Sequence, residues 1–179
     1  MAVNLELKIK IDSPKEYERK LKLNGAKFID VIKQKDIYYK VNKGLLKLRK
    51  EKDNFYLIKY LRDESGKRWS NYEILELKGN NPEKYLSEIF EVDCIVEKSR
   101  ILYLYGNTRI HLDNVKNLGW FLELESVVVK NKKSATKEFQ EVVNFLDIDL
   151  SKQIRKSYRN LLSKWYWQNQ ISKKLIWIF

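Results

Sequence analysis

Several segments of this chain alternate strictly between apolar and polar residues, and this alternation limits its fold more than any other feature. In the segment Val3–Asp12, leucine or isoleucine fills every second position from residue 5, and Asn4, Glu6, Lys8 and Lys10 lie between them. Successive side chains of a β-strand point to opposite faces of its sheet. The segment is therefore predicted to form a strand with one apolar and one charged face.

The same spacing of ionisable residues recurs in later segments. The further groups are Lys47/Arg49, Lys98/Arg100, Arg109/His111/Asp113 and Glu123/Glu125, and Lys59 stands alone in its segment. A charged strand face usually meets water. Solvated faces, however, favour Thr, Ser and Lys, and they are not sorted into basic and acidic strands. We therefore expect these charged faces to share one surface.

Turn residues divide the rest of the chain into further strands and helices. The expected strands are Phe28–Tyr39, Leu45–Glu51, Phe55–Leu61, Trp69–Lys78, Ile95–Tyr105, Thr108–Leu112 and Trp120–Val129. The expected helices are about Ser13–Gly25, Pro82–Phe90, Ser134–Leu146 and Ser151–Lys164. So many antiparallel strands usually close into a barrel or split into two sheets, because a long exposed edge is a liability. The predicted fold is α+β: a closed antiparallel eight-stranded β-barrel, charged inside, with helices packed outside.

A lumen lined in this way suits a phosphorylated ligand and a metal ion. Arginine and lysine bind phosphate oxygens through charge-assisted hydrogen bonds. The candidate cations are Lys8, Lys47, Arg49, Lys59, Lys98, Arg100 and Arg109. Clustered carboxylates hold Mg²⁺ or Mn²⁺, which prefer hard oxygen ligands. The candidate carboxylates are Glu6, Asp113, Glu123 and Glu125.

Short motifs along the chain resemble those of one known family. They are Asn4–Lys8, Gln34–Tyr39, Leu46–Arg49, Leu57–Lys59, Glu97–Arg100, Arg109–Asp113, Leu118–Glu125 and Lys156–Leu162. In this order they are similar to the motifs of the CYTH family, which includes class IV adenylyl cyclases, thiamine triphosphatases and inorganic triphosphatases. The resemblance covers roughly residues 3–163. Two departures are Asn4, where the family has a glutamate, and Asn71, where a strand of the family often has an arginine.

The resemblance implies a triphosphate tunnel metalloenzyme domain over residues 1–164. It implies that Lys8 and Arg49 are catalytic and that the divalent metal, Mg²⁺ or Mn²⁺, is bound by the four candidate carboxylates. It also implies that a triphosphate is bound by Lys47, Arg49, Lys59, Lys98, Arg100 and Arg109.

The resemblance leaves three functions open. The Lys156–Leu162 motif favours a class IV adenylyl cyclase, which converts ATP to cyclic AMP and pyrophosphate. A triphosphatase acting on inorganic, thiamine or nucleoside triphosphate would use the same site. Asn4 removes one negative charge from the metal site, and it favours a third function, a non-catalytic module that binds a nucleotide or polyphosphate.

Composition restricts the partners and the location. The 36 basic residues exceed the 24 acidic ones and give a net charge of +12, which indicates an anionic partner or a lysine-rich surface. The sequence has no nucleic-acid motif, so we expect no specific nucleic-acid partner. It has one cysteine, no signal-like N-terminus and no apolar stretch long enough to span a membrane, which favours the cytoplasm.

The segment 165–179 is rich in aromatic residues and lies beyond the family resemblance. It could pack on the barrel, form a contact in a homodimer or touch a membrane. Packing on the barrel or on a partner subunit is the favoured interpretation.

Overall fold

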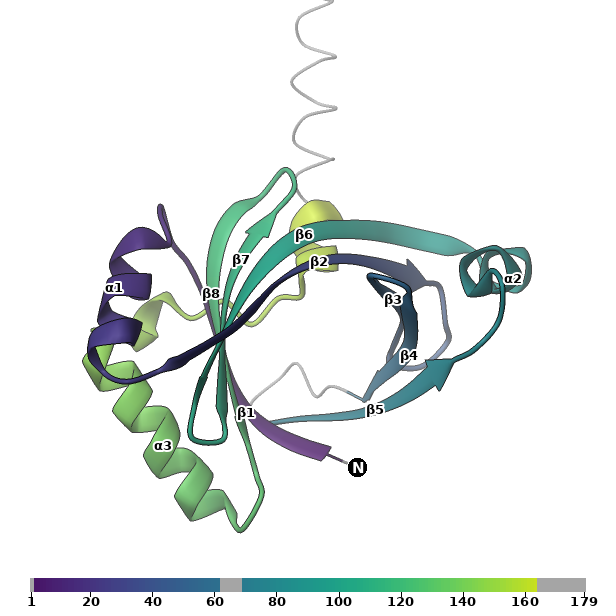
Figure 1. Cartoon of the computed structure of the whole chain (residues 1–179). Coiled ribbons are helices and arrows are strands. Elements are labelled where there is room, and N and C mark those ends of the chain that lie inside the picture. The colour runs from purple at the N-terminus through teal and green to yellow at the C-terminus, as the bar shows by residue number, and fades with distance from the viewer. Residues whose placement is uncertain (1, 62–68, 164–179) are drawn as a thin grey trace, which may run out of the picture.

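Eight antiparallel strands and a small set of helices make up the computed structural model, which describes residues 2–61 and 69–163 (Figure 1). The strands are β1 Ala2–Lys10, β2 Lys27–Tyr39, β3 Leu45–Glu51, β4 Asn54–Leu61, β5 Trp69–Leu77, β6 Val92–Tyr105, β7 Thr108–Val115 and β8 Gly119–Val127. The helices are α1 Lys15–Leu23, α2 Pro82–Ile89 and α3 Lys132–Phe145, with a 3₁₀ turn at Leu150–Lys152 and a further helical segment over 158–163. The predictions of an α+β class and of eight antiparallel strands are confirmed.

The strands pair in the order β1-β5-β4-β3-β2-β6-β7-β8, and β1 is a neighbour of both β5 and β8. Its pairing with β8 extends from Asn4 to Lys10, whereas its pairing with β5 extends only from Ala2 to Leu5. The sheet therefore curls strongly, and its hydrogen-bonded order returns to β1. Figure 1 shows the long strands β2 and β6 arching over the space that the other strands enclose.

The hydrophobic core lies between the outer face of the sheet and the helices. The apolar face of β1 packs with α3 residues such as Phe139 and Val142, and all of these side chains are buried. On the other half of the sheet, Leu86 of α2 covers Ile37 and Leu48 of β2 and β3. Figure 1 shows α1 and α3 on one side of the sheet and α2 at the opposite side. Because the apolar faces point outward to the helices, the charged faces point inward.

The chain after α3 differs from the predicted helix Ser151–Lys164. After the 3₁₀ turn, residues 153–157 form an irregular segment, here called the strap, and helical structure begins again only at residue 158. The strap is extended because the backbone N–H of Ile154 donates to the carbonyl of Lys8 on β1, at 2.7 Å. Ser157 then caps the helical segment by accepting the N–H of Asn160 on its Oγ, at 3.2 Å.

Two further predictions concern the ends of the chain. None of the helices within the described ranges has both the length and the apolar character needed to cross a membrane. The aromatic segment 165–179 lies outside the described residues, so its predicted packing is not addressed.

Candidate active site

The strand register brings the charged inner faces together around one lumen. Arg49 lies opposite Asp36, Arg100 opposite Asp113 and Lys8 opposite Glu123 in their strand pairs. Two connected cavities fill the enclosed space. The strap compartment, about 70 Å³, is lined by Ser157 and Tyr158 at one end of the barrel. The far compartment, about 190 Å³, is lined by Asn4 and Gln34 towards the other end.

Asp36 on β2 holds two of the predicted phosphate-binding cations. Its carboxylate accepts the Nζ of Lys47 at 2.7 Å, and the Nε and Nη2 of Arg49 at 2.7 and 2.8 Å. Burial alone would raise the pKa of Asp36, but the charges of Arg49 and Lys47 outweigh it and hold that pKa well below its usual range. Burial together with the neighbouring Arg49 lowers the pKa of Lys47 to about 7. The carboxylate therefore stays ionised and fixes both cations in place.

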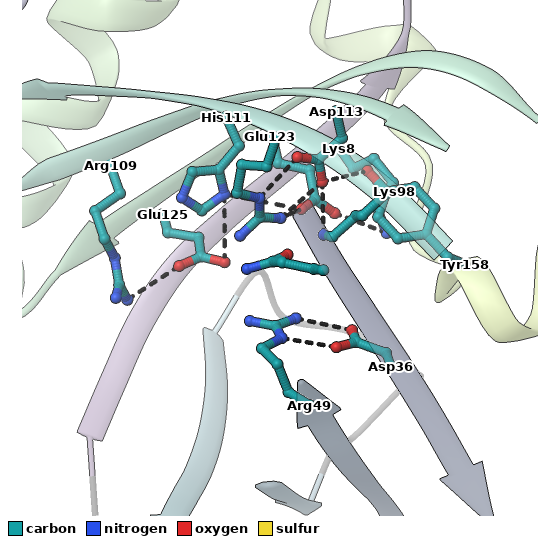
Figure 2. A network of polar contacts seen from close by, with 12 residues as sticks. Lys8, Asp36, Arg49, Lys98, Arg109, His111, Asp113, Glu123, Glu125 and Tyr158 are labelled. Carbon is teal, nitrogen blue, oxygen red and sulfur yellow. Dashed lines mark hydrogen bonds and ion pairs between the residues drawn. The ribbon is translucent and has the colours of Figure 1, made fainter. Parts of the chain in front are cut away.

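Asp113 on β7 repeats this arrangement with two cations of β6. It accepts the Nζ of Lys98 at 2.7 Å and both the Nε and Nη2 of Arg100 at 2.7 Å, and the hydroxyl of Tyr158 donates to it at 3.2 Å. Burial raises the pKa of Asp113, but Arg100 and Lys98 lower it to about 2. Figure 2 shows Asp36 with Arg49 at the bottom of the polar network and Asp113 at the top, near Lys98 and Tyr158. We call these two arrangements the Asp36 clamp and the Asp113 clamp.

An acidic cluster on β7 and β8 lies beside the Asp113 clamp. One side-chain ligand atom each of His111, Glu123 and Glu125 lie within 4.8 Å of one another. Burial and the neighbouring Arg100 lower the pKa of His111, which keeps the imidazole neutral at pH 7. Its Nδ1 is 3.8 Å from Glu125 and 3.9 Å from Glu123, too far for a hydrogen bond. A neutral nitrogen between two carboxylates is a donor set that can hold a divalent metal ion.

Lys8 joins the acidic cluster to the strap. Its Nζ lies 3.0 Å from Glu123, donates to the carbonyl of Lys156 at 3.1 Å and lies 4.1 Å from the centre of the Tyr158 ring. Glu6, two residues earlier on the same strand, lines both compartments. The inner face of β1 therefore contributes one cation and one carboxylate next to the acidic cluster.

Two predicted site residues have other positions or partners. Lys59 does not enter the lumen: it is exposed and faces Glu73 on the outer face, at 3.7 Å, because Tyr60 has the inward phase of β4. Asp113 was expected to bind metal, but its side chain is fully buried and both of its oxygens accept hydrogen bonds from cations. The structure makes it an anchor for Lys98 and Arg100 instead.

The remaining predicted residues do meet in the lumen. Glu6, Lys8, Lys47, Arg49, Lys98, Arg100, Arg109, Glu123 and Glu125 line one or both compartments. Asp36 and Tyr158, which had no predicted role, are central to the two clamps. Asp36 could have been identified from its phase, because it alternates with Gln34 and Tyr38 on the polar side of β2. The contact of Tyr158 with Asp113 depends on the path of the strap, which the sequence pattern does not indicate.

Comparison with known proteins agrees with the family resemblance of the sequence motifs. The sequence profile of the CYTH domain matches residues 2–158. A "putative adenylate cyclase" of Methanocaldococcus jannaschii is 32% identical over 174 residues, which cover 89% of this chain and 98% of that protein.

Solved structures share the fold. The PH1012 protein of Pyrococcus horikoshii has a TM-score of 0.74 and 25% identity, covering 88% of this chain and 98% of its own. A Hippeastrum protein, described as a putative adenylyl cyclase with a dominant triphosphatase activity, has a TM-score of 0.65 and 12% identity. That match covers 92% of this chain and 96% of the Hippeastrum chain, and at such identity it shows a common fold alone.

Proposed function

Because this chain belongs to the CYTH family, we propose that its lumen is a triphosphate tunnel that binds ATP with Mg²⁺ or Mn²⁺ and converts it to cyclic AMP and pyrophosphate. The observation that carries this proposal is the pair of clamps, which together place two lysines and two arginines around one cavity. Cations grouped in this way suit a chain of several phosphates better than a single one. The 32% identical relative named as an adenylate cyclase supports the choice of reaction.

The clamps leave hydrogen-bond donors for a ligand. A guanidinium carries five N–H groups, and Asp36 occupies only the Nε and one Nη2 donor of Arg49. Arg100 also donates to Glu123, at 2.8 Å, so its Nη1 group remains for a ligand. Since the aspartates fix the guanidinium planes of Arg49 and Arg100 in advance, phosphate oxygens would meet preorganised donors in a partly dehydrated space.

The residues present fit a divalent metal ion. His111, Glu123 and Glu125 would hold it, and Glu6 lines the same space. When bound, the ion would neutralise phosphate charge and polarise the phosphorus that is attacked. The protein's own groups would do the rest: Arg49, Lys47, Lys98, Arg100 and Arg109 would hold the phosphates, and Lys8, close to Glu123, would stabilise charge that develops on them.

A triphosphatase is the second candidate. The same residues would serve if water attacked the terminal phosphorus in place of the ribose hydroxyl, since both reactions are in-line phosphoryl transfers that depend on positioning and charge. The dominant triphosphatase activity of the Hippeastrum protein supports this candidate at the level of the fold. A non-catalytic binding module would keep the clamps and show no turnover.

The products of purified protein test these candidates. ATP, tripolyphosphate and thiamine triphosphate are incubated with Mg²⁺ or Mn²⁺, and we expect cyclic AMP and pyrophosphate from ATP. Phosphate release would favour the triphosphatase, and no product from any of the three would favour the binding module.

Replacing Glu123 and Glu125 together with Gln should abolish metal-dependent turnover and leave the fold intact, because the metal loses two anionic ligands. Glu97→Gln on the outer face of β6 is the matched control. Full activity in the double variant would exclude this metal site.

A further inference from the structure

The far compartment holds a concentration of buried polar atoms without partners. Among the residues that the structure describes, Asn4 Oδ1, Gln34 Oε1, Arg109 Nε and His111 Nδ1 are buried and make no hydrogen bond. All four residues line this one cavity. Buried polar atoms almost always have a partner, so such a group marks the place of a ligand or of ordered water.

The strap compartment is different in this respect. There the carboxylates of Asp36, Asp113 and Glu123 are already paired with Lys47, Lys98 and Lys8 or with the two clamp arginines. Its charges suit phosphates, which would compete with the carboxylates for the same donors. Of the four unmet groups of the far compartment, Arg109 Nε and His111 Nδ1 belong to the phosphate and metal positions of the proposed function. The other two, Asn4 Oδ1 and Gln34 Oε1, are neutral acceptors, and neutral acceptors suit N–H donors.

One part of the far compartment is apolar and aromatic, and the rest is charged or polar. The apolar and aromatic part is formed by Ile32, Ile58, Ile74, Leu102, Tyr60 and Tyr72, and the charged part includes Glu6, Arg49, Glu51, Arg100, Arg109 and Glu125. The rings of Tyr60 and Tyr72 lie 6.1 Å apart between centres, at 38° to each other. The volume of about 190 Å³ is below the roughly 300–1,000 Å³ of pockets for drug-sized ligands. The cavity therefore suits one flat ring system with polar atoms on its edge.

The Gln34 acceptor is fixed by its surroundings. Gln34 donates its Nε2 to Glu51, so the amide is oriented with Oε1 as the acceptor that lacks a donor. Gln34 is 5% exposed, and Asn4 is 1% exposed. A buried acceptor that meets no donor destabilises the protein. A ligand with a matching N–H group would remove that penalty, so these positions favour ligands that carry an N–H group over ligands that lack one.

We propose that the far compartment binds the heterocyclic base of a nucleoside triphosphate, and that Gln34 and Asn4 accept hydrogen bonds from an amino group on its edge. This inference rests on the proposed function, because it places the phosphates of the same ligand in the clamps. The two compartments are continuous, since Glu6, Arg49, Tyr60, Arg100 and Glu125 line both. One ligand can therefore occupy both at once.

The test compares ATP with purine riboside 5′-triphosphate, which lacks only the amino group, and with tripolyphosphate, which has no base. Calorimetry without divalent metal prevents turnover. We expect wild type to bind ATP at least tenfold more tightly than the purine riboside analogue, because a site built for an N–H group rejects a ligand without one. Gln34→Leu should reduce this ratio below threefold and change the affinity for tripolyphosphate less than threefold. Lys33→Leu, exposed on the outer face of β2, is the matched control and should keep the wild-type ratio.

The outcomes separate this inference from the proposed function. If none of the three ligands binds wild type, the proposed function fails. If tripolyphosphate binds but ATP and the purine riboside analogue bind equally, the far compartment does not read an amino group, and only this inference is overturned. A wild-type preference for ATP that survives in both Gln34→Leu and Asn4→Leu would overturn the assignment of these two residues. Thermal unfolding shows whether each variant folds. If a variant does not fold, the comparison of ATP with the purine riboside analogue in the wild-type protein still tests whether the amino group is recognised.

Discussion

The two buried aspartates have the same task on two neighbouring strand pairs, β2–β3 and β6–β7. Asp36 and Asp113 each hold a lysine and an arginine that are two positions apart on the neighbouring strand, with nearly identical distances. In both cases the aspartate lies opposite the arginine in the strand register. The lumen can therefore keep both arginines buried and charged before any phosphate arrives, because each already has a counter-charge, whereas burial lowers the pKa of Lys47 and of Lys98.

Removing one of these charges should destabilise the ligand-free protein. Asp113→Asn keeps the shape but leaves Lys98 and Arg100 buried without their partner, which should lower the free energy of unfolding by about 3–5 kcal/mol. Denaturant unfolding measures this change. Saturating tripolyphosphate should recover part of it, since phosphate oxygens would replace the lost carboxylate. The control is Asp30→Asn, also on β2, which removes an exposed ion pair with Lys52 and should change stability little. An Asp113→Asn variant as stable as wild type would contradict the role of the clamp.

The sequence predicts most residues of the lumen because the phase of a strand fixes the direction of its side chains. It fails at Lys59, where a lone charge in an apolar segment gives no second residue to fix the phase, and Ile58 and Tyr60 of β4 face inward instead. It also fails at Asp113. The spacing of a carboxylate does not show whether its oxygens face a metal ion or accept from buried cations.

At the scale of elements, the strap explains why the end of the fold departs from the sequence prediction. The apolar residues after Leu150 fit a helix, but in residues 153–157 the N–H of Ile154 donates to the carbonyl of Lys8 on β1, and the carbonyl of Lys156 accepts from the Lys8 side chain. Tertiary pairing of this kind overrides local helix propensity. The eight strands were predictable to within a few residues, because their alternation is strong and turn residues separate them.

Tyr158 should carry much of the stability of this element. Tyr158→Phe removes only the hydroxyl that donates to Asp113 and should cost about 0.5–1.5 kcal/mol. Tyr158→Ala also removes the ring beneath Lys8 and its contact with Phe121, and should cost about 3–5 kcal/mol. Unfolding free energies of the two variants measure the difference. Equal losses would mean that the hydroxyl, and not the ring, fixes the strap.

At the scale of the whole molecule, the excess positive charge lies outside the lumen. Among the described residues, the lining cations are Lys8, Lys47, Arg49, Lys98, Arg100 and Arg109. They are matched by the carboxylates Glu6, Asp36, Glu51, Glu123 and Glu125 of the lining and by Asp113 behind it. The described lining therefore contributes no excess charge, and the net charge of +12 does not by itself indicate the substrate.

This separation of charges predicts two kinds of anion binding with different salt dependence. Binding of DNA to exterior lysines should fall steeply between about 50 and 200 mM salt, because it releases counterions. Tripolyphosphate in the lumen should lose less affinity, because buried pairs are screened less. Arg100→Ala should weaken tripolyphosphate binding by about 2–4 kcal/mol and leave DNA binding unchanged. Calorimetry at both salt concentrations measures this, and a variant that loses both ligands equally would place the triphosphate on the exterior.

The position of β1 has a consequence for how the protein is made. β1 is synthesised before its partners β5 and β8, and the strap that bonds to it follows even later. Until β8 is synthesised, β1 has only its short pairing with β5, and the acidic cluster has His111 but neither Glu123 nor Glu125. The clamps lie on β2, β3, β6 and β7, so they can form before the metal position, and a chain arrested before β8 has cations for phosphate but lacks two of the three proposed metal ligands.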